Sequence, residues 1–536
     1  MLIEQIQPTT KAPSTSLRSF APALALFALC LPSLLFVWHN RDVPHFGILQ
    51  DDGLYFIDGK SLAEGSGYRI LSLPAQPHET RYPPLYPLYL SLAWRINPSF
   101  PANLPLALML SWLSFPVLVV LTYLWCRRQR LPAPVTWLVV VLFALNPYLL
   151  FFVSNLGSET MFMAFLFGAI LMAEPDSGRT NWYRPLLAGV LAGAGYLVRT
   201  AGMVFLPAAI AYFVWKKKPR QALWFTLGML PAMIGWTLWT HANAAPGRDV
   251  VTVAYTNYIA SYIHSVGWDN IANILWNNFS AMLESFGSLV FPQMIQGVLA
   301  KFILQPLGVA MILGVVKMLR KGYGGLYAWF AGFYVALLMI WHFLPNQRYV
   351  MPLAPLLLAG LCFEMAHLAT LMRTAFGHRD RSQRIVAYGF AGFLTLVLAT
   401  GLGLQIYMGF SVMPEMASDD RSHAKAYGRI YQWIDKNLPA NAAVLWEGDT
   451  VLYLATGRHG SSFVFLPREF LATGGEEGEA TRTRTIDAYA REAHLGYVLL
   501  TKVGLHRNEE ALHVAAANPK LERIHEEDGG ILYRVR

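Results

Sequence analysis

The sequence predicts a polytopic α-helical membrane protein with about eleven transmembrane helices, followed by a small extracytoplasmic α/β domain. Of its 536 residues, 55% are hydrophobic and only 14% are charged, and the mean hydropathy is +0.37. Soluble proteins are usually about one-quarter charged. The net charge of +9 at first suggests nucleic acid, but the basic residues fall in short loops between apolar runs. No nucleic-acid partner is therefore expected.

Eleven apolar runs approach the length of about twenty residues that a membrane-spanning helix needs. They cover 20–38, 103–125, 134–153, 158–173, 184–198, 200–215, 221–240, 297–319, 325–344, 350–372 and 386–409. The fifth and sixth are short and meet at Arg199, so they can also be interpreted as one broken helix. The first run follows Lys11 and Arg18 and ends without a clear cleavage site, which indicates a retained span rather than a signal peptide.

The basic loops predict the orientation. Clusters of Lys and Arg occupy alternate connections and therefore lie on one side, which is the cytoplasm by the positive-inside rule. The clusters are Lys11/Arg18, Arg127/Arg128/Arg130, Arg179/Arg184, Lys216/Lys217/Lys218/Arg220, Lys317/Arg320/Lys321 and Arg373/Arg379/Arg381/Arg384. We therefore predict a multi-pass protein of the inner (plasma) membrane, with a cytoplasmic tail at 1–19 and a transmembrane module at 20–412. The loops 39–102 and 241–296 would face outward, together with a soluble domain at 413–536.

Two stretches outside the spans have patterns of their own. The segment 81–97 is apolar and rich in Tyr and Trp but too short to span, so we place it as a helix on the outer membrane surface. From about Met413 the composition is that of a soluble protein, and helix and strand patterns alternate as in a small α/β domain. The expected helices are 421–438, 449–455, 486–494 and 508–517, and the expected strands are 443–446, 496–500 and 531–535.

An acidic pair, Asp51 and Asp52, follows the first span, and Tyr55 comes soon after it. Further along the same loop, Arg81 and Tyr82 open a rigid Arg-Tyr-Pro-Pro segment. Acidic residues at a membrane face are costly and are candidates for function, although an isolated one more often caps a helix. A carboxylate here can act as a general base on a hydroxyl group, or the pair can hold a divalent cation.

Four further polar residues lie at the outward ends of predicted spans. Glu159 enters an apolar helix, and a functional site and a simple helix-dipole role explain it equally well. Arg199 lies in a broken hydrophobic segment, which favours a lined cavity over snorkelling to lipid headgroups. Arg348 opens a span and can anchor it or bind a phosphate. The nearby His342 is more often an interfacial histidine than a metal ligand.

Cysteine and glycine patterns narrow the chemistry further. Cys30, Cys126 and Cys362 are far apart in sequence and match no metal or disulfide spacing, so we expect small buried hydrophobic side chains. The sequence has no glycine-rich phosphate loop, so direct use of nucleoside triphosphates is not expected. Gly189 and Gly193 form a small-xxx-small pair, which is typical of helix packing.

The order and sidedness of these motifs resemble those of the GT-C glycosyltransferases. The likeness covers about residues 20–410 and rests on an outward loop that opens with Asp-Asp, the Arg-Tyr surface helix and a Ser-Glu pair between the third and fourth spans. It rests also on a basic residue between two short spans, Arg199, and on a late Arg-Tyr-x-x-Pro motif that begins at Arg348. Within that fold the chain is most similar to the protein O-mannosyltransferases and the aminoarabinose transferase of lipid A, in and around glycosyltransferase family 39.

The resemblance implies a sugar donor linked to a polyprenyl phosphate, which binds from the outer leaflet. Asp51 matches the first acid of the family's loop motif and would be the general base, and Asp52 stands where many relatives have Glu. Glu159 matches a second acidic position, and Arg81 and Arg199 match positions that hold the donor phosphate. A single displacement with one base would invert the configuration at the anomeric carbon.

The sequence thus predicts one outward-facing site that uses a lipid-linked sugar and a hydroxyl on a lipid, protein or glycan acceptor. Its expected residues are Asp51, Asp52 and Glu159 for catalysis, Arg81, Arg199 and Arg348 for the donor phosphate, and Tyr55, Tyr82 and His342 for the acceptor or the cavity wall. No resident metal is assigned beyond the divalent-cation alternative.

Three alternatives stay open at this point. A transporter or lipid flippase would share the many spans, but it would be expected to show internal repeats, and we find none. A ligase or polymerase that uses a pyrophosphate-linked donor would share the charge pattern. A non-catalytic sugar-binding subunit is disfavoured because candidate acids and bases are all present.

Overall fold

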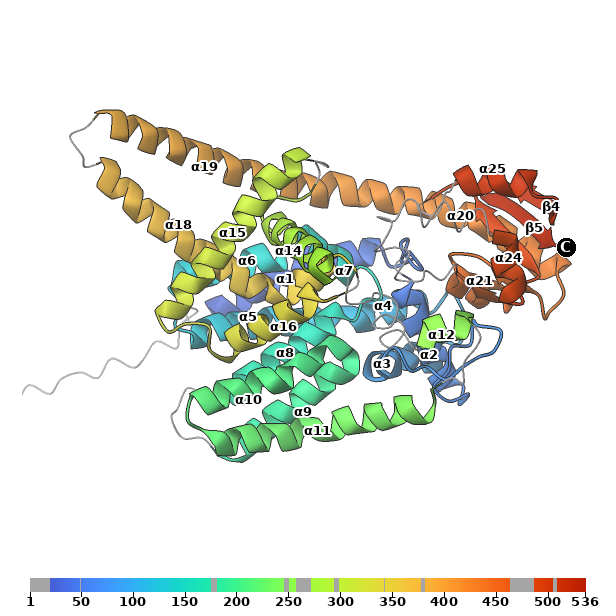
Figure 1. The fold of residues 1–536 in the computed structure, drawn as a ribbon, viewed down its shortest axis with the longest axis horizontal. Helices are drawn as coiled ribbons and strands as arrows, with labels where there is room; N and C mark the ends of the chain where they lie inside the picture. Colours follow the sequence, from blue (N-terminus) through green and yellow to red (C-terminus); the bar gives the residue numbers. More distant parts are fainter. Residues whose placement is uncertain are drawn as a thin grey trace, which may run out of the picture.

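The protein is described here by a computed structural model that covers residues 20–48, 50–174, 181–244, 250–256, 271–293, 298–341, 343–376, 381–462, 486–504 and 509–536. These residues form a large bundle of helices and, at one end of the bundle, a small domain built on a five-stranded sheet (Figure 1). The expected architecture, a multi-pass helical membrane protein with a C-terminal α/β unit, is confirmed.

The bundle contains helices of very different lengths. In chain order they are α1 (Ala21–His39), α4 (Leu104–Trp112), α5 (Ser114–Arg128), α6 (Ala133–Ala144), α7 (Pro147–Val153), α8 (Glu159–Ala173), α9 (Tyr183–Val198), η2 (Thr200–Val204), α10 (Phe205–Trp215), α11 (Pro219–Ala242), α15 (Val298–Arg320), α16 (Gly325–Met339), α17 (Gln347–Val350), η4 (Met351–Leu353), α18 (Ala354–Phe376) and α19 (Arg381–Tyr407). Each of the eleven apolar runs in the sequence coincides with one of these helices or with consecutive ones.

Length separates these helices into two groups. Among the described residues, six helical stretches are long and apolar enough to cross a membrane, and the bent pair α6 and α7 makes a seventh. Four other predicted spans, α8, α9, η2–α10 and α16, have only 15 or 16 residues. At a rise of about 1.5 Å per residue they are shorter than a hydrocarbon core of about 30 Å. The count of eleven spans therefore stays a prediction.

Helix α1 illustrates how the apolar runs are used. Its buried residues include Leu26, Cys30 and Val37, which recur at helical spacing and form one stripe toward the bundle. Other apolar side chains on the same helix are open, and Leu24 is 68% exposed. Because a large exposed apolar surface is unfavourable in water, we interpret this second face as the face that contacts lipid.

Helices α9 and α11 pack closely because glycines remove side chains from their interface. A Cβ atom added at Gly189 would overlap with the backbone carbonyl of Phe225, and one at Gly228 would overlap with the carbonyl of Leu186. Gly193 of α9 lies against Met229 and Ala232 of α11. The helix-packing role predicted for Gly189 and Gly193 is therefore confirmed.

This interface gives a stability prediction. We expect Gly189→Ala to lower the free energy of unfolding by about 1–3 kcal/mol, because the new methyl group meets backbone atoms that cannot rotate away. The matched control is Gly235→Ala in α11, where an added Cβ would have open space around it. Thermal unfolding of the purified protein in one detergent compares the two variants, and equal transition temperatures would contradict the prediction.

The long connections carry four further helices. They are α2 (Asp51–Ala63) and α3 (Leu85–Ile96) in the first connection, and α12 (Val250–Thr256) and α14 (Ile271–Ser288) in the second. Helix α3 is the helix expected within 81–97. It buries Tyr86, Leu90 and Trp94 and exposes Leu88 and Ile96, so one edge is apolar and open. Its place on the outer membrane surface remains a prediction.

The C-terminal unit begins as the continuation of a bundle helix. Helix α19 passes through a π-helical turn, η5 (Met408–Val412), into α20 (Met413–Asn437), and Figure 1 shows this long rod reaching the sheet. The helix expected at 421–438 ends where predicted, before Pro439, but its predicted start is wrong. Pro414 removes one intrahelical hydrogen bond, and the wider π turn accommodates it without ending the helix.

The sheet has the strand order β2-β1-β3-β5-β4, with β1 parallel to β2 and β3 and with β5 antiparallel to β3 and β4. Its strands and the remaining helices are β1 (Ala443–Leu445), α21 (Asp449–Thr456), β2 (His459–Ser461), α24 (Ile486–Glu492), β3 (Tyr497–Thr501), α25 (Glu509–Ala517), β4 (Leu521–Glu527) and β5 (Gly530–Val535). All expected elements are present. The sequence did not predict strands β2 and β4. Strand β2 has only three residues, and β4 is a charged strand at the sheet edge without an apolar alternation.

Candidate functional site

Helix α2 places Asp51 at its first position, and this carboxylate meets residues from two distant segments. One oxygen of Asp51 lies 2.8 Å from Nη1 of Arg348, and the other accepts a hydrogen bond from the hydroxyl of Tyr82. Arg348 is the second residue of the short helix α17, whose N-cap Asn346 accepts a hydrogen bond from the Arg348 amide. Asp51 and Arg348 are therefore both held at the starts of helices, where backbone geometry is well defined.

Glu159 and Arg199 form the second half of the site. Glu159 is the first residue of α8 and is buried, and one of its oxygens accepts a hydrogen bond of 2.7 Å from Nη1 of Arg199. Arg199 occupies the extended residue between α9 and η2, where the helix breaks. Gly202 allows this break to fold tightly, because a Cβ atom there would press on the backbone of Tyr196. The broken segment predicted around Arg199 is present, and it lines a cavity.

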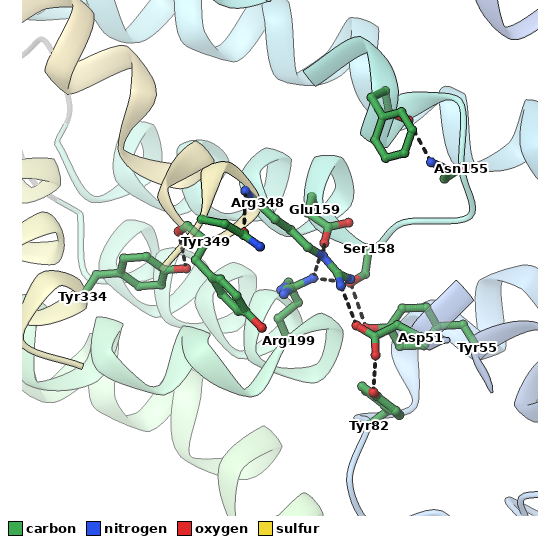
Figure 2. Close-up of polar contacts among 12 residues, drawn as sticks. Asp51, Tyr55, Tyr82, Asn155, Ser158, Glu159, Arg199, Tyr334, Arg348 and Tyr349 are labelled. Atoms are coloured by element: carbon green, nitrogen blue, oxygen red, sulfur yellow. Dashed lines mark hydrogen bonds and ion pairs between the residues drawn. The ribbon is translucent and has the colours of Figure 1, made fainter. Parts of the chain in front are cut away.

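Arg348 connects the two halves. Its Nε donates to the same oxygen of Glu159 that binds Arg199, while its Nη1 faces Asp51 (Figure 2). Nη2 of Arg348 is buried and has no hydrogen-bond partner among the described residues. Ser158 accepts a hydrogen bond of 3.0 Å from Arg199 and donates to the hydroxyl of Tyr55. Two acids and two guanidinium groups from four parts of the chain thus form one connected cluster.

A cavity of about 890 Å³ opens beside this cluster. Its lining comes from the segments 50–55, 80–83, 196–203, 236–244, 334–341 and 343–349, together with Thr256. Asp51, Arg199 and Arg348 lie on its polar wall. Leu337, Leu344 and other apolar side chains also line the cavity. A cavity lined by both charged and apolar side chains fits an amphipathic ligand with an anionic group.

Arg81 contributes a third guanidinium group to the cavity. It lines the cavity and lies over the ring of Tyr82, with its guanidinium carbon 4.9 Å from the ring centre. Three arginines, Arg81, Arg199 and Arg348, thus line the cavity together with Asp51. Glu159 contacts Arg199 and Arg348 but does not itself line the cavity. With both acids ionised, this cluster has an excess of one positive charge.

The charges around Asp51 favour its ionised form. Burial alone would raise its pKa, but Arg348 and Arg81 and the hydrogen bond from Tyr82 outweigh burial, so the pKa lies below the usual aspartate value. Asp51 is therefore a carboxylate at neutral pH and can accept a proton.

Asp52 does not share this environment, which corrects its interpretation as a partner of Asp51 in the site. Its carboxylate accepts hydrogen bonds from the amides of Gly47, at 2.9 Å, and Gly53, at 3.0 Å, and it does not line the cavity. Burial raises its pKa to about 6. Successive residues of a helix point in different directions, about 100° apart, so neighbours in sequence separate in space.

The predicted aromatic residues have different outcomes. Tyr55 and Tyr82 both line the cavity, and their rings pack edge to face with centres 4.9 Å apart. His342 lies outside the described residues. The sequence interpretation did not include Tyr334 and Tyr349, whose side chains also line the cavity. The Arg-Tyr pair that includes Tyr349 is the signal that could have indicated it.

A second pair of acids, also missed from the sequence, supports the Arg81 segment from behind. Glu79 accepts hydrogen bonds from the amides of Arg81 and Tyr82 through one oxygen, and its other oxygen has no donor among the described residues. Both oxygens of the buried Asp58 also lack a donor there. Because two ionised carboxylates only accept hydrogen bonds, a bond between these acids requires a proton on one of them. Burial and this mutual repulsion raise the pKa of Asp58, and burial raises that of Glu79 to about 7.

This pair predicts a pH dependence of stability. The folded protein retains a proton on this pair that the unfolded chain loses above about pH 4. The contribution of the pair to the free energy of unfolding should therefore be complete below that pH and be lost as pH rises through about 7. We expect Asp58→Asn to reduce this loss, because the N–H groups of a carboxamide can donate a hydrogen bond to Glu79 at any pH. Thermal unfolding from pH 5 to 9 measures both slopes. Identical slopes for the variant and the unaltered protein would contradict the assignment.

The divalent-cation alternative gains no support from the acidic pair. Asp51 faces Arg348 and Tyr82, whereas Asp52 faces two backbone amides, so the two carboxylates do not converge on one point. Within the part of the chain that the structure describes, no three His, Cys, Asp or Glu side chains form a group that could hold a metal. The three cysteines are free, and Cys30 and Cys126 are buried as expected.

Comparison with known proteins identifies the fold. The crystal structure of ArnT from Cupriavidus metallidurans bound to undecaprenyl phosphate aligns with 96% of this chain and 98% of its own, at 9% sequence identity and a TM-score of 0.53. The apo structure of the same protein aligns over the same shares at 11% identity and a TM-score of 0.53. The chain has the fold of ArnT. The GT-C-like architecture implied by the sequence resemblance is therefore confirmed.

Other comparisons add little to the likeness with ArnT. The oligosaccharyltransferase of Archaeoglobus fulgidus, tethered with an acceptor peptide, aligns with 88% of this chain and 69% of its own, at 12% identity and a TM-score of 0.48. No protein-family model matches the sequence, and no curated protein sequence matches it. The likeness to ArnT thus lies in the fold rather than in the sequence.

Proposed function

We propose that this protein is an integral-membrane glycosyltransferase that moves a sugar from a polyprenyl-phosphate donor to a hydroxyl group of a lipid, protein or glycan acceptor. The observation that carries the proposal is the cavity in which Asp51 lies among Arg81, Arg199 and Arg348. The shared fold with ArnT, which was crystallised with undecaprenyl phosphate, supports the same class of donor.

The three arginines suit the donor phosphate. Guanidinium groups bind phosphate oxygens through paired N–H donors, and a partly desolvated site strengthens these contacts. Arg348 has a buried Nη2 with no hydrogen-bond partner among the described residues, so it has bonding capacity to offer. The apolar side chains that line the cavity, such as Leu337 and Leu344, are suited to the first isoprene units.

The reaction would be a single displacement. The acceptor oxygen attacks the anomeric carbon, its proton passes to Asp51, and the bond from the anomeric carbon to the phosphate oxygen breaks. The electron pair of that bond leaves with polyprenyl phosphate, whose negative charge the arginines stabilise. Attack opposite the leaving group inverts the configuration at the anomeric carbon.

Arg348 would also regulate the basicity of Asp51. Without donor, Arg348 is paired with Asp51 and Glu159. A donor phosphate competes for the same guanidinium group, so its arrival would weaken the pairing with Asp51 and raise the proton affinity of the base. Glu159 would keep Arg348 and Arg199 in place during this exchange, because it contacts both.

We also propose that the site faces the extracytoplasmic side of the inner membrane. At the end of the bundle remote from the C-terminal domain, helices α11 and α19 begin, next to basic residues (Figure 1). The ends of α5 and α8 and the start of α16 meet one another, through Arg128 bonded to the Glu174 carbonyl and Gln129 bonded to the Gly324 amide. These ends carry the basic loops, so the positive-inside rule supports a cytoplasmic N-terminus and an outward C-terminal domain.

The test is incubation of the purified protein with a polyprenyl-phosphate sugar and a mixture of acceptors. Time-dependent release of polyprenyl monophosphate, with the sugar attached to an acceptor, is the expected result. A ligase or polymerase would instead require a pyrophosphate-linked donor and release polyprenyl pyrophosphate. A flippase would move the intact donor across liposomes and release neither product.

A further inference from the structure

The residue immediately before Asp51 has a strained backbone. Gln50 has φ +61° and ψ −45°, in the region that residues other than glycine rarely adopt. Such a conformation persists only where the surroundings hold it. Gln50 lines the cavity together with Asp51, and its carbonyl accepts the first hydrogen bond of α2, from Leu54. The conformation of Gln50 therefore sets where α2 starts and where the Asp51 carboxylate lies.

The contacts that hold Gln50 come from outside the bundle. Its Nε2 donates to Oγ of Ser462, at 2.8 Å, and to the hydroxyl of Tyr255, at 3.0 Å. Ser462 directly follows β2 of the C-terminal domain, and Tyr255 belongs to α12. Gln50 is thus tied to two segments that lie about two hundred and four hundred positions further along the chain.

The hydroxyl of Tyr255 is the centre of this network. It donates to Oδ2 of Asp449 at 3.1 Å, lies 2.8 Å from Oγ of Ser462, and accepts a hydrogen bond of 3.1 Å from the Ser462 amide. Tyr255, Asp449 and Ser462 are all buried. Oδ1 of Asp449 has no hydrogen-bond partner among the described residues, whereas the Tyr255 hydroxyl contacts Gln50, Asp449 and Ser462. Because groups in a buried hydrogen-bond network depend on one another, loss of the Tyr255 hydroxyl should displace Gln50.

Tight packing accompanies the network. Helix α21 of the C-terminal domain begins at Asp449 and lies against α2, as Figure 1 shows. A Cβ atom added at Gly53 would overlap with the side chain of Thr450, and one added at Gly47 would overlap with Val451. The first turn of α2 and the loop before it therefore rest directly on α21.

We infer that the C-terminal domain positions the catalytic base, and that Gln50, Tyr255, Asp449 and Ser462 are positioning residues that hold Asp51 toward Arg348 and Tyr82. The inference rests on the proposed function in naming Asp51 as the base. It also assigns a role to the C-terminal domain, which would otherwise need only to bind a partner or an acceptor.

The central experiment compares Tyr255→Phe with Tyr431→Phe in the full-length protein. Tyr431 is a buried tyrosine of α20 in the C-terminal domain, whose hydroxyl accepts a hydrogen bond from Trp446 and makes no described contact with Gln50. We expect Tyr255→Phe to lower kcat by about tenfold to a hundredfold, because catalytic groups displaced by about 1 Å lose rates of that order. The Kd for polyprenyl phosphate should stay the same, and Tyr431→Phe should keep the original kcat.

Amide hydrogen exchange gives a readout that does not depend on the reaction. Tyr255→Phe should speed exchange of the amides in the first turn of α2, residues 51–55, whereas Tyr431→Phe should not. If the unaltered protein releases no polyprenyl phosphate, the proposed function fails, but this exchange measurement still tests the positioning. Unchanged exchange and unchanged kcat in Tyr255→Phe would overturn the inference. Equal losses in both variants would also overturn it, because they would indicate only general destabilisation.

A second comparison separates the side-chain tether from the backbone strain. Gln50→Gly accepts a positive φ without strain but lacks the side-chain amide group. Gln50→Ala lacks the amide group and is also strained at a positive φ. We expect both variants to lose kcat, and we expect the double variant Gln50→Ala with Tyr255→Phe to be no worse than the poorer single variant. Full activity in Gln50→Gly, or additive losses in the double variant, would show that the network does not position Asp51.

Discussion

Replacement of Asp51 by Asn is expected to lower kcat for sugar transfer by about 10²–10⁴-fold, the usual contribution of a general base. An amide of the same shape cannot take the acceptor proton, but it can still accept the hydrogen bond from Tyr82. Donor binding should persist, because Arg81 and Arg199 are unaffected. The measurement is polyprenyl phosphate release under single-turnover conditions, with equilibrium binding of polyprenyl phosphate in parallel.

Asp52→Asn is the matched control for this experiment. Asp52 is the adjacent aspartate, but its carboxylate bonds to the amides of Gly47 and Gly53 and does not line the cavity. We expect this variant to lose stability more than kcat. If Asp51→Asn transfers sugar normally, or if Asp52→Asn alone abolishes transfer, the assignment of the base is wrong.

The pH profile adds an independent check on Asp51. Its pKa lies below the usual aspartate value, so the free enzyme holds the base ionised from neutral pH down to about pH 4. The kcat/KM profile should therefore show no loss from protonation of the base above that pH. A loss of kcat/KM as pH falls, with a midpoint near neutrality, would point to another group as the proton acceptor.

Replacement of Arg348 is expected to have the second large effect, on both donor binding and stability. Arg348→Met removes the partner of Asp51 and one of the two partners of Glu159, and breaking a buried ion pair by removing one partner typically costs about 3–5 kcal/mol. Arg348→Lys keeps the charge but cannot face both acids and a phosphate at once. We therefore expect Arg348→Lys to fold and to bind polyprenyl phosphate at least about tenfold more weakly.

Arg421→Lys is the control for the loss of a forked guanidinium group. Arg421 contacts Asp42 through Nε at 2.6 Å and Nη2 at 2.9 Å, but this pair lies near the surface, and Asp42 is 51% exposed. Exposed ion pairs contribute about 0–1 kcal/mol, so Arg421→Lys should have nearly the original unfolding temperature and nearly the original affinity for polyprenyl phosphate. Thermal unfolding and lipid binding measure all three variants. Unaltered donor affinity in Arg348→Met would remove Arg348 from the proposed phosphate site.

The elements that the sequence predicted well are those with a local signal. The apolar runs give the bundle helices, and the alternation around Ala443 and Tyr497 gives β1 and β3. Gly457 has φ +69° at the end of α21, as expected of a glycine that closes a helix. The charged strand β4 was missed, because it is stabilised by pairing with β5 and not by its own composition.

The candidate site was predicted in part. Asp51, Glu159, Arg199 and Arg348 were each recognised as costly charges at span ends, and they meet in one cluster. Glu79 and Asp58 were not recognised, because acids in a long outward loop are ordinary until their burial is known. Gln50 carried no signal either, because neither its strained φ nor its contacts with Tyr255 and Ser462 can be read from a glutamine in sequence.

The sequence by itself determined the helical membrane architecture and the residues at which charge is expensive, because hydropathy and helical periodicity are properties of short stretches. Only the tertiary structure decided which charges meet. Glu159 and Arg348 are 189 positions apart, and Gln50 and Ser462 are 412 apart. Contacts over such distances depend on how the helices pack, and a rotation of about 100° per residue is enough to turn Asp51 into the cavity and Asp52 away from it.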